Sequence, residues 1–139
     1  MKRAALALLV AAVAVAGCTS SSQSSSSADK FSDPDQKAIA EKIEDLESAG
    51  RRGQADDICT DILAKTLVSQ LDAAGTDCAT EMQKAIDDAT QFDLEVTKVT
   101  INGNEATAEV KQGDDGPTET MTFTKESGDW RATALSEGR

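Results

Sequence analysis

The sequence predicts an α+β domain in which N-terminal helices pack on one face of a C-terminal four-stranded antiparallel meander. Three observations predict this class. Apolar residues recur at helical spacing from Pro34 to Ala89, the spacing changes to the alternation of strands from Leu94, and three short turns divide the strand half. Helices that precede a sheet in this way pack on its apolar face. The 139 residues allow at most one ordinary domain.

The N-terminal residues are typical of a signal peptide. Met1-Lys2-Arg3 is positively charged, and residues 4–16 form an uncharged apolar run. This run is shorter than the ~20 residues that a helix needs to cross a bilayer.

Val15-Ala16-Gly17-Cys18 follows this run and resembles the lipobox of bacterial lipoprotein precursors. The resemblance implies cleavage between Gly17 and Cys18 and acylation of Cys18 by diacylglycerol and a fatty acid such as palmitate. Two or more chains, at ~0.8 kcal/mol per buried methylene, would hold the protein on the extracytoplasmic face of the cell membrane. Thr19, which is not Asp, implies the outer membrane in a host with two membranes. The alternative is an ordinary secretory signal that contains a chance cysteine.

The serine-rich stretch after Cys18 predicts a flexible tether. Residues 19–27 read TSSSQSSSS and offer nothing to bury. Sixteen residues separate Cys18 from Pro34, so a random coil would span about 20–24 Å and lift the domain clear of the lipid headgroups.

The first helix is predicted to start at Asp33-Pro34. Asp33 suits the N-cap, Pro34 suits the first helical position, and Gln36 would close a capping box. Gly50 is expected to end the helix. Its apolar side is formed by Ile39, Ile43 and Leu46.

Cys59 and Cys78 are predicted to form a disulfide, because export places them in an oxidising compartment and leaves an even pair. Cα atoms in a disulfide lie ~4.4–6.8 Å apart, so the chain would have to break near residues 63–66 into helices of about 55–63 and 66–73. A third helix would carry Cys78 on its core face, with Met82 and Ile86. The alternative is two buried free thiols on a longer helix. Without a C-x-x-C motif or histidine, redox catalysis and zinc binding are poor interpretations.

The strand half is predicted to be a meander joined by tight turns. Asn102-Gly103 is a strong hairpin signal. Ala106, Ala108 and Val110 are expected to face inward, with threonines on the solvent face of the following strand. The four strands are expected at residues 95–101, 105–111, 118–125 and 130–135.

The net negative charge argues against some classes of binding partner. The net charge is -11, which argues against nucleic acid and against docking on anionic lipid through charge. The carboxylate pairs fall on polar helix faces or in turns, and the turns at 102–105 and 113–116 lack the spacing of calcium loops. We expect no metal site and no cofactor. The pairs are Asp56-Asp57, Asp87-Asp88 and Asp114-Asp115.

The order of helices and strands, a cysteine in a short helix and the closing GDWRATAL are similar to the nuclear transport factor 2-like superfamily, and more narrowly to exported actinobacterial-type lipoproteins. This resemblance implies a cystatin-like cone over residues 34–135. Catalytic members use His with Asp, or Asp with Tyr, and this chain contains no His and no Tyr.

The expected organisation is a cleaved signal peptide (1–17), a lipidated linker (18–33), the α+β domain (34–135) and a tail (136–139). The expected function is a non-catalytic binding or accessory domain of the cell envelope that uses either the interior of the cone, for a small apolar ligand, or the solvent face of the sheet. The alternatives are an enzyme with a lone buried carboxylate as general base, and an interaction module that binds an envelope protein through the threonine-rich face.

Replacement of Cys18 tests the anchor. Cys18→Ala should move the protein out of the membrane fraction, or stall it as an uncleaved precursor, because no acyl chain can then be attached. Fractionation of host cells followed by mass spectrometry of the N-terminus measures both effects. Unchanged membrane association of the variant would contradict lipidation.

Overall fold

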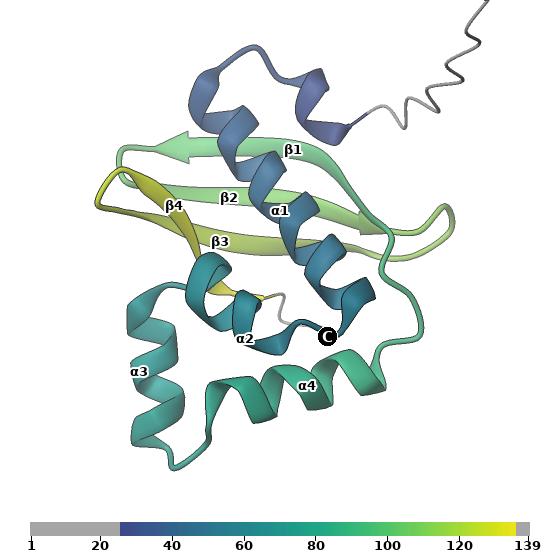
Figure 1. Ribbon diagram of the computed structural model, residues 1–139. Coiled ribbons are helices and arrows are strands. Elements are labelled where there is room, and N and C mark those ends of the chain that lie inside the picture. Colours follow the sequence, from purple (N-terminus) through teal and green to yellow (C-terminus); the bar gives the residue numbers. More distant parts are fainter. Residues whose placement is uncertain (1–25, 136–139) are drawn as a thin grey trace, which may run out of the picture.

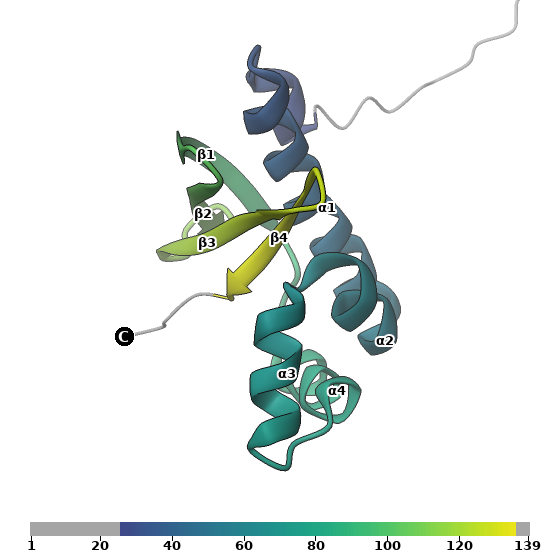
Figure 2. The same cartoon turned by 90° about the vertical axis from the view of Figure 1, so that its left-hand side faces the viewer.

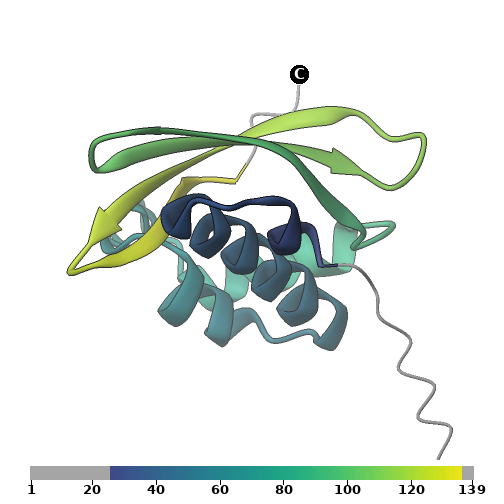
Figure 3. The same ribbon diagram turned by 90° about the horizontal axis from the view of Figure 1, so that it is seen from above.

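The computed structural model describes residues 26–135 and has two layers, a helical layer and a sheet. The curved sheet arches over the helices, which cover one of its faces (Figure 3). The predicted α+β class is confirmed. The elements are η1 (Ser27–Lys30), α1 (Pro34–Arg52), α2 (Ala55–Asp57), the π-helical η2 (Ile58–Ile62), α3 (Lys65–Ala73), α4 (Cys78–Asp88), β1 (Leu94–Asn102), β2 (Glu105–Gln112), β3 (Thr118–Glu126) and β4 (Asp129–Ala134). No helix among the described residues is long and apolar enough to cross a membrane.

The sheet is the predicted antiparallel meander, with strand order β1-β2-β3-β4. The hairpin predicted from Asn102-Gly103 is confirmed, but the turn lies one residue later: Asn102 pairs with Glu105, and the two turn residues are Gly103, with a positive φ of 64°, and Asn104. Ala106, Ala108 and Val110 are buried against the helices, as predicted. Phe123 and Met121, the β3 partners of the two alanines, and Ala132, the β4 partner of Phe123, continue the same apolar face.

Helix α1 crosses this face diagonally (Figure 1). Ile39 and Ile43 are fully buried beneath it, whereas Leu46 is only partly buried. From the side, α1 runs along the sheet while α3 and α4 lie together beyond it (Figure 2). The helical layer therefore covers the sheet unevenly.

The N-cap of α1 is confirmed, but the capping box is not formed. Asp33 accepts hydrogen bonds from the backbone N–H groups of Asp35 and Gln36, at 3.0 and 3.1 Å. The Gln36 side chain does not return to Asp33. Its amide donates to the Val99 carbonyl of β1 at 3.0 Å, so it satisfies an acceptor of the sheet.

The predicted end of α1 at Gly50 is wrong. The helix continues to Arg52, and Gly53 caps it with a left-handed φ of 68°. Gly50 is required for a different reason. A Cβ at this position would stand 2.5 Å from the Phe92 ring, so only glycine lets that ring lie against the helix.

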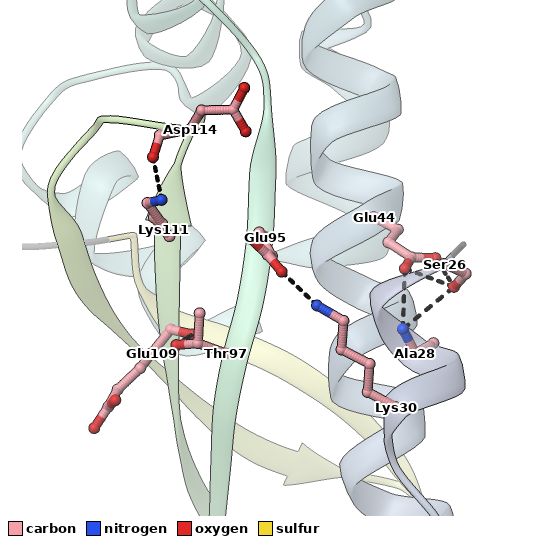
Figure 4. Close-up of polar contacts among 9 residues, drawn as sticks. All are labelled: Ser26, Ala28, Lys30, Glu44, Glu95, Thr97, Glu109, Lys111 and Asp114. Atoms are coloured by element: carbon pink, nitrogen blue, oxygen red, sulfur yellow. Dashed lines mark hydrogen bonds and ion pairs between the residues drawn. The ribbon is translucent and has the colours of Figure 1, made fainter. Parts of the chain in front are cut away.

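The boundary predicted at residue 33 is also wrong, because the fold begins earlier. Ser26 caps the short helix η1, and Ala28 is 1% exposed within the core cluster. The Ser26 hydroxyl lies 2.6 and 2.8 Å from the two carboxylate oxygens of Glu44 (Figure 4). Residues 26–33 therefore belong to the domain. The rest of the expected linker lies outside the described residues, as do the expected signal peptide and the tail at 136–139.

The start of α1 is fastened to the β3–β4 hairpin by one carboxylate. Asp35 Oδ1 accepts from Lys125 Nζ at 2.8 Å and from Trp130 Nε1 at 3.0 Å. These hydrogen bonds, that of Lys125 first, lower the pKa of Asp35 below its ordinary value. The contribution of this contact to stability is therefore present above pH ~3.8 and is lost as the pH falls through the lowered pKa.

Candidate functional site

The structure brings two of the predicted site residues together. Cys59 and Cys78 form a disulfide with Cα atoms 6.2 Å apart. Cys59 comes from η2, and Cys78 is the first residue of α4. Cys78 is buried, as predicted, and the bond fastens η2 to α4. Gly17 and Cys18, the predicted cleavage and lipidation residues, lie outside the described residues.

The break required by this disulfide occurs at Leu63 and Ala64. Both residues have extended backbone, and α3 starts at Lys65, close to the predicted position. The Ala64 N–H donates to the Ala132 carbonyl of β4 at 2.8 Å. A backbone hydrogen bond to the sheet thus holds the chain where it turns back. The widened π-helical turn before the break was not predicted.

Asp77 caps α4 directly beside Cys78. Its Oδ1 accepts from the Thr80 N–H at 2.9 Å and from the Thr80 hydroxyl at 2.8 Å. These bonds, that of the backbone N–H first, lower the pKa of Asp77. Asp77 is therefore an ionised cap that fixes the start of the helix.

Among the described residues there is no buried carboxylate that could act as a general base. Between residues 26 and 135 no polar or charged side chain is buried. Besides Asp35 and Asp77, Glu95 has a lowered pKa, chiefly because Lys30 donates a hydrogen bond to it. A carboxylate that acts as a general base near neutral pH needs a raised pKa instead. The part of the chain that the structure describes also holds no group of three or more Cys, Asp or Glu arranged for a metal ion.

An apolar cleft of about 450 Å³ lies between the helices and the sheet. Its floor is formed by the buried side chains of Ile58, Val110 and Met121. Partly buried apolar side chains form its walls. The wall residues are Leu46 of α1, Met82 and Ile86 of α4, Phe92 of the α4–β1 loop, Leu94 of β1 and Leu135 after β4.

The lining also includes the polar residues Asp88, Thr90, Gln91, Gln112 and Glu119. Gln112 Nε2 donates to Glu119 Oε2 at 2.7 Å, and both residues line the cleft. Glu119 occupies an inward-facing position, because it is the register partner of Val110. An apolar cleft with a few placed polar groups is the usual form of a small-molecule site.

Met82 and Ile86 were predicted to share the core face of the third helix, and the structure shows what that face does. They line the cleft and stay partly exposed. Periodicity identifies an apolar face but not whether a neighbour covers it. The cleft was not predicted for this reason.

The solvent face of the sheet carries a row of threonines across all four strands. Thr100 pairs with Thr107, Thr107 pairs with Thr122, and the Thr122 and Thr133 hydroxyls lie 2.8 Å apart. They line a hollow of about 500 Å³. The row lacks the large apolar or aromatic anchors that dominate protein interfaces. The cleft is therefore the stronger candidate site.

In comparisons with protein-family models, curated proteins and solved structures, none matches this chain. The site must be interpreted from its own geometry.

Removal of one cysteine tests the disulfide. Cys59→Ser should lower the free energy of unfolding by about 3 kcal/mol, because the unfolded chain is no longer cross-linked. Chemical denaturation with and without reductant measures the loss. Reductant should destabilise the wild type and leave Cys59→Ser unchanged, and the Cys59→Ser/Cys78→Ser variant should lose no more than the single variant. Equal stability of the wild type with and without reductant would refute the bond.

Proposed function

We propose that this chain is a membrane-anchored envelope lipoprotein whose domain binds a small apolar ligand without catalysing a reaction. The observation that carries the proposal is the cleft between α4, α1 and the inner face of the sheet. The lipobox-like stretch ending at Cys18 supports the anchor. Helices on one face of a curved meander support a fold of the nuclear transport factor 2-like kind.

The size and lining of the cleft suit a small molecule. Its volume of about 450 Å³ falls within the ~300–1,000 Å³ of typical ligand pockets. Burial of apolar ligand surface contributes about 25 cal/mol per Å², so the apolar walls supply the affinity. The Gln112–Glu119 pair supplies orientation.

Binding without catalysis fits the titratable groups better than the enzyme alternative does. No carboxylate in residues 26–135 is buried, so the general base that the alternative needs has no candidate there. Glu119 faces the cleft, but Gln112 already donates to it.

A bulky substitution at the rim of the cleft tests this function. Ala85 lines the cleft from α4 and is exposed, so Ala85→Trp should fill part of the space without disturbing the core. Ala73→Trp is the matched control, since Ala73 is an exposed alanine on α3 outside the cleft lining. The probe is N-phenyl-1-naphthylamine, a neutral apolar dye that fluoresces when bound.

The wild type and Ala73→Trp should bind the dye equally, and Ala85→Trp should bind it about tenfold more weakly, equivalent to a loss of about 1.4 kcal/mol. Circular dichroism melting of all three proteins controls for folding. Absence of dye binding by the wild type, or equal binding by folded Ala85→Trp, would contradict a ligand site in the cleft.

A further inference from the structure

The charged residues that line the cleft are all acidic. They are Asp88, at the end of α4, and Glu119 on β3, and none of the lysines and arginines in residues 26–135 lines the cleft. From this lining we propose that the natural ligand of the cleft is a small apolar molecule that carries one protonated amine. The proposal rests on the proposed function and names the chemical class of its ligand.

Glu119 and Gln112 interrupt the apolar inner face of the sheet. Glu119, Met121 and Phe123 alternate along β3 on the side that faces the helices, and only Glu119 among them is polar. Gln112 takes the next inner position after Val110 on β2. A strand face that only closes a core needs apolar residues at both positions, and exceptions to such a pattern are expected at functional sites. The two exceptions meet in the cleft, where they form a hydrogen bond.

Gln112 fixes the Glu119 carboxylate without supplying a positive charge. Its Nε2 donates to Glu119 Oε2 at 2.7 Å. In the part of the chain that the structure describes, no lysine or arginine forms an ion pair with Glu119, and no donor bonds its Oε1. Glu119 is partly exposed. One carboxylate oxygen is therefore available to a hydrogen-bond donor on a ligand.

The lysines next to lining residues in the sequence do not reach the cleft. Lys84 precedes Ala85 on α4, but it is exposed and lies outside the lining. Lys111 precedes Gln112 on β2, so its side chain points to the other face of the sheet, where it donates to the Asp114 carbonyl (Figure 4). A ligand carboxylate would therefore lose its water beside two other carboxylates without meeting a cation, which is costly.

A protonated amine suits this lining better than a neutral polar group does. A neutral apolar ligand would cover Glu119 and remove water from a charged group at a cost in free energy. An ammonium group replaces that water with an N–H donor, and a hydrogen bond to a charged partner is roughly twice as strong as a neutral one. The hydrocarbon part of the same ligand would lie against the apolar walls, among them Met82, Ile86 and Leu94.

Three compounds that differ mainly in their polar group test the proposal. They are 4-phenylbutylamine, 4-phenylbutanol and 4-phenylbutyrate, which are cationic, neutral and anionic at neutral pH. If a carbon takes about the volume of a water molecule, ~30 Å³, such a ligand of about ten carbons needs about 300 Å³ and fits the cleft of about 450 Å³. Displacement of N-phenyl-1-naphthylamine from the full-length protein measures each affinity. The amine should bind the wild type about tenfold more tightly than the alcohol, and the acid should bind more weakly than the alcohol.

Two variants of equal net charge separate the cleft from the overall charge of the protein. Glu119→Gln removes the carboxylate but leaves an amide oxygen that can accept from Gln112, so the preference for the amine should be lost. Glu105→Gln removes an exposed carboxylate of β2 outside the cleft lining and should keep the preference. The neutral dye should bind all three proteins equally, which controls for folding of the cleft. At about 0.15 M salt the Debye length is about 8 Å, so remote carboxylates are screened.

The outcomes separate this inference from the proposed function. If the dye binds but the amine binds the wild type no better than the alcohol, the amine proposal is wrong and an apolar ligand site remains. The same conclusion holds if Glu119→Gln keeps the preference, or if both variants lose it equally. If the wild type does not bind the dye, the proposed function fails and the amine proposal fails with it.

Discussion

The arrangement of this domain depends on one polar stripe along α1. Glu44, Glu47 and Arg51 lie at spacings of three and four residues, and each binds a segment distant in sequence: η1, the start of β1 and the α4–β1 loop. The neighbouring side of the helix packs Ile39 and Ile43 into the core. A single helix thus fixes the entry of the chain, one wall of the cleft and one face of the core. Only one orientation of α1 makes these polar contacts and also buries these apolar side chains. The polar and the apolar residues of the helix therefore specify its placement together.

The elements around the cleft are held by a few large side chains and one covalent bond. The aromatic residues number only four in the whole chain. Phe123 and Trp130 fill the core near the β3–β4 hairpin, whereas Phe92 lies against Gly50 at the cleft wall. The disulfide holds α4, which forms another wall, at its N-terminal end.

The sequence was sufficient to predict those structural features that are caused by residues close together in the chain. The N-cap at Asp33, the hairpin predicted from Asn102-Gly103 and the alternation of β2 each depend on neighbouring residues, and each was predicted. The failures have distant causes. Gly50 is explained by Phe92, 42 positions away, and the fold begins at Ser26 because Glu44 accepts from it across 18 positions. The cleft has the same origin: α4 shows an apolar face, but only the assembled fold decides that Met82 and Ile86 remain partly uncovered. The disulfide was predicted from the expected export to an oxidising compartment, an argument that does not depend on the fold.

The central claim is that the chain is fastened to α1 at Glu44, so that the domain begins at Ser26. Amide hydrogen exchange at Ala28, followed by NMR, measures this most directly. The Ala28 N–H is buried and donates to Glu44 and to Ser26, so it should exchange on the timescale of the α1 amides rather than of a solvated chain. In Glu44→Gln its exchange should accelerate while the Ile43 amide stays protected. Exchange of the Ala28 amide at the rate of an unstructured peptide in the wild type would show that the chain is not fastened there, and would contradict the account.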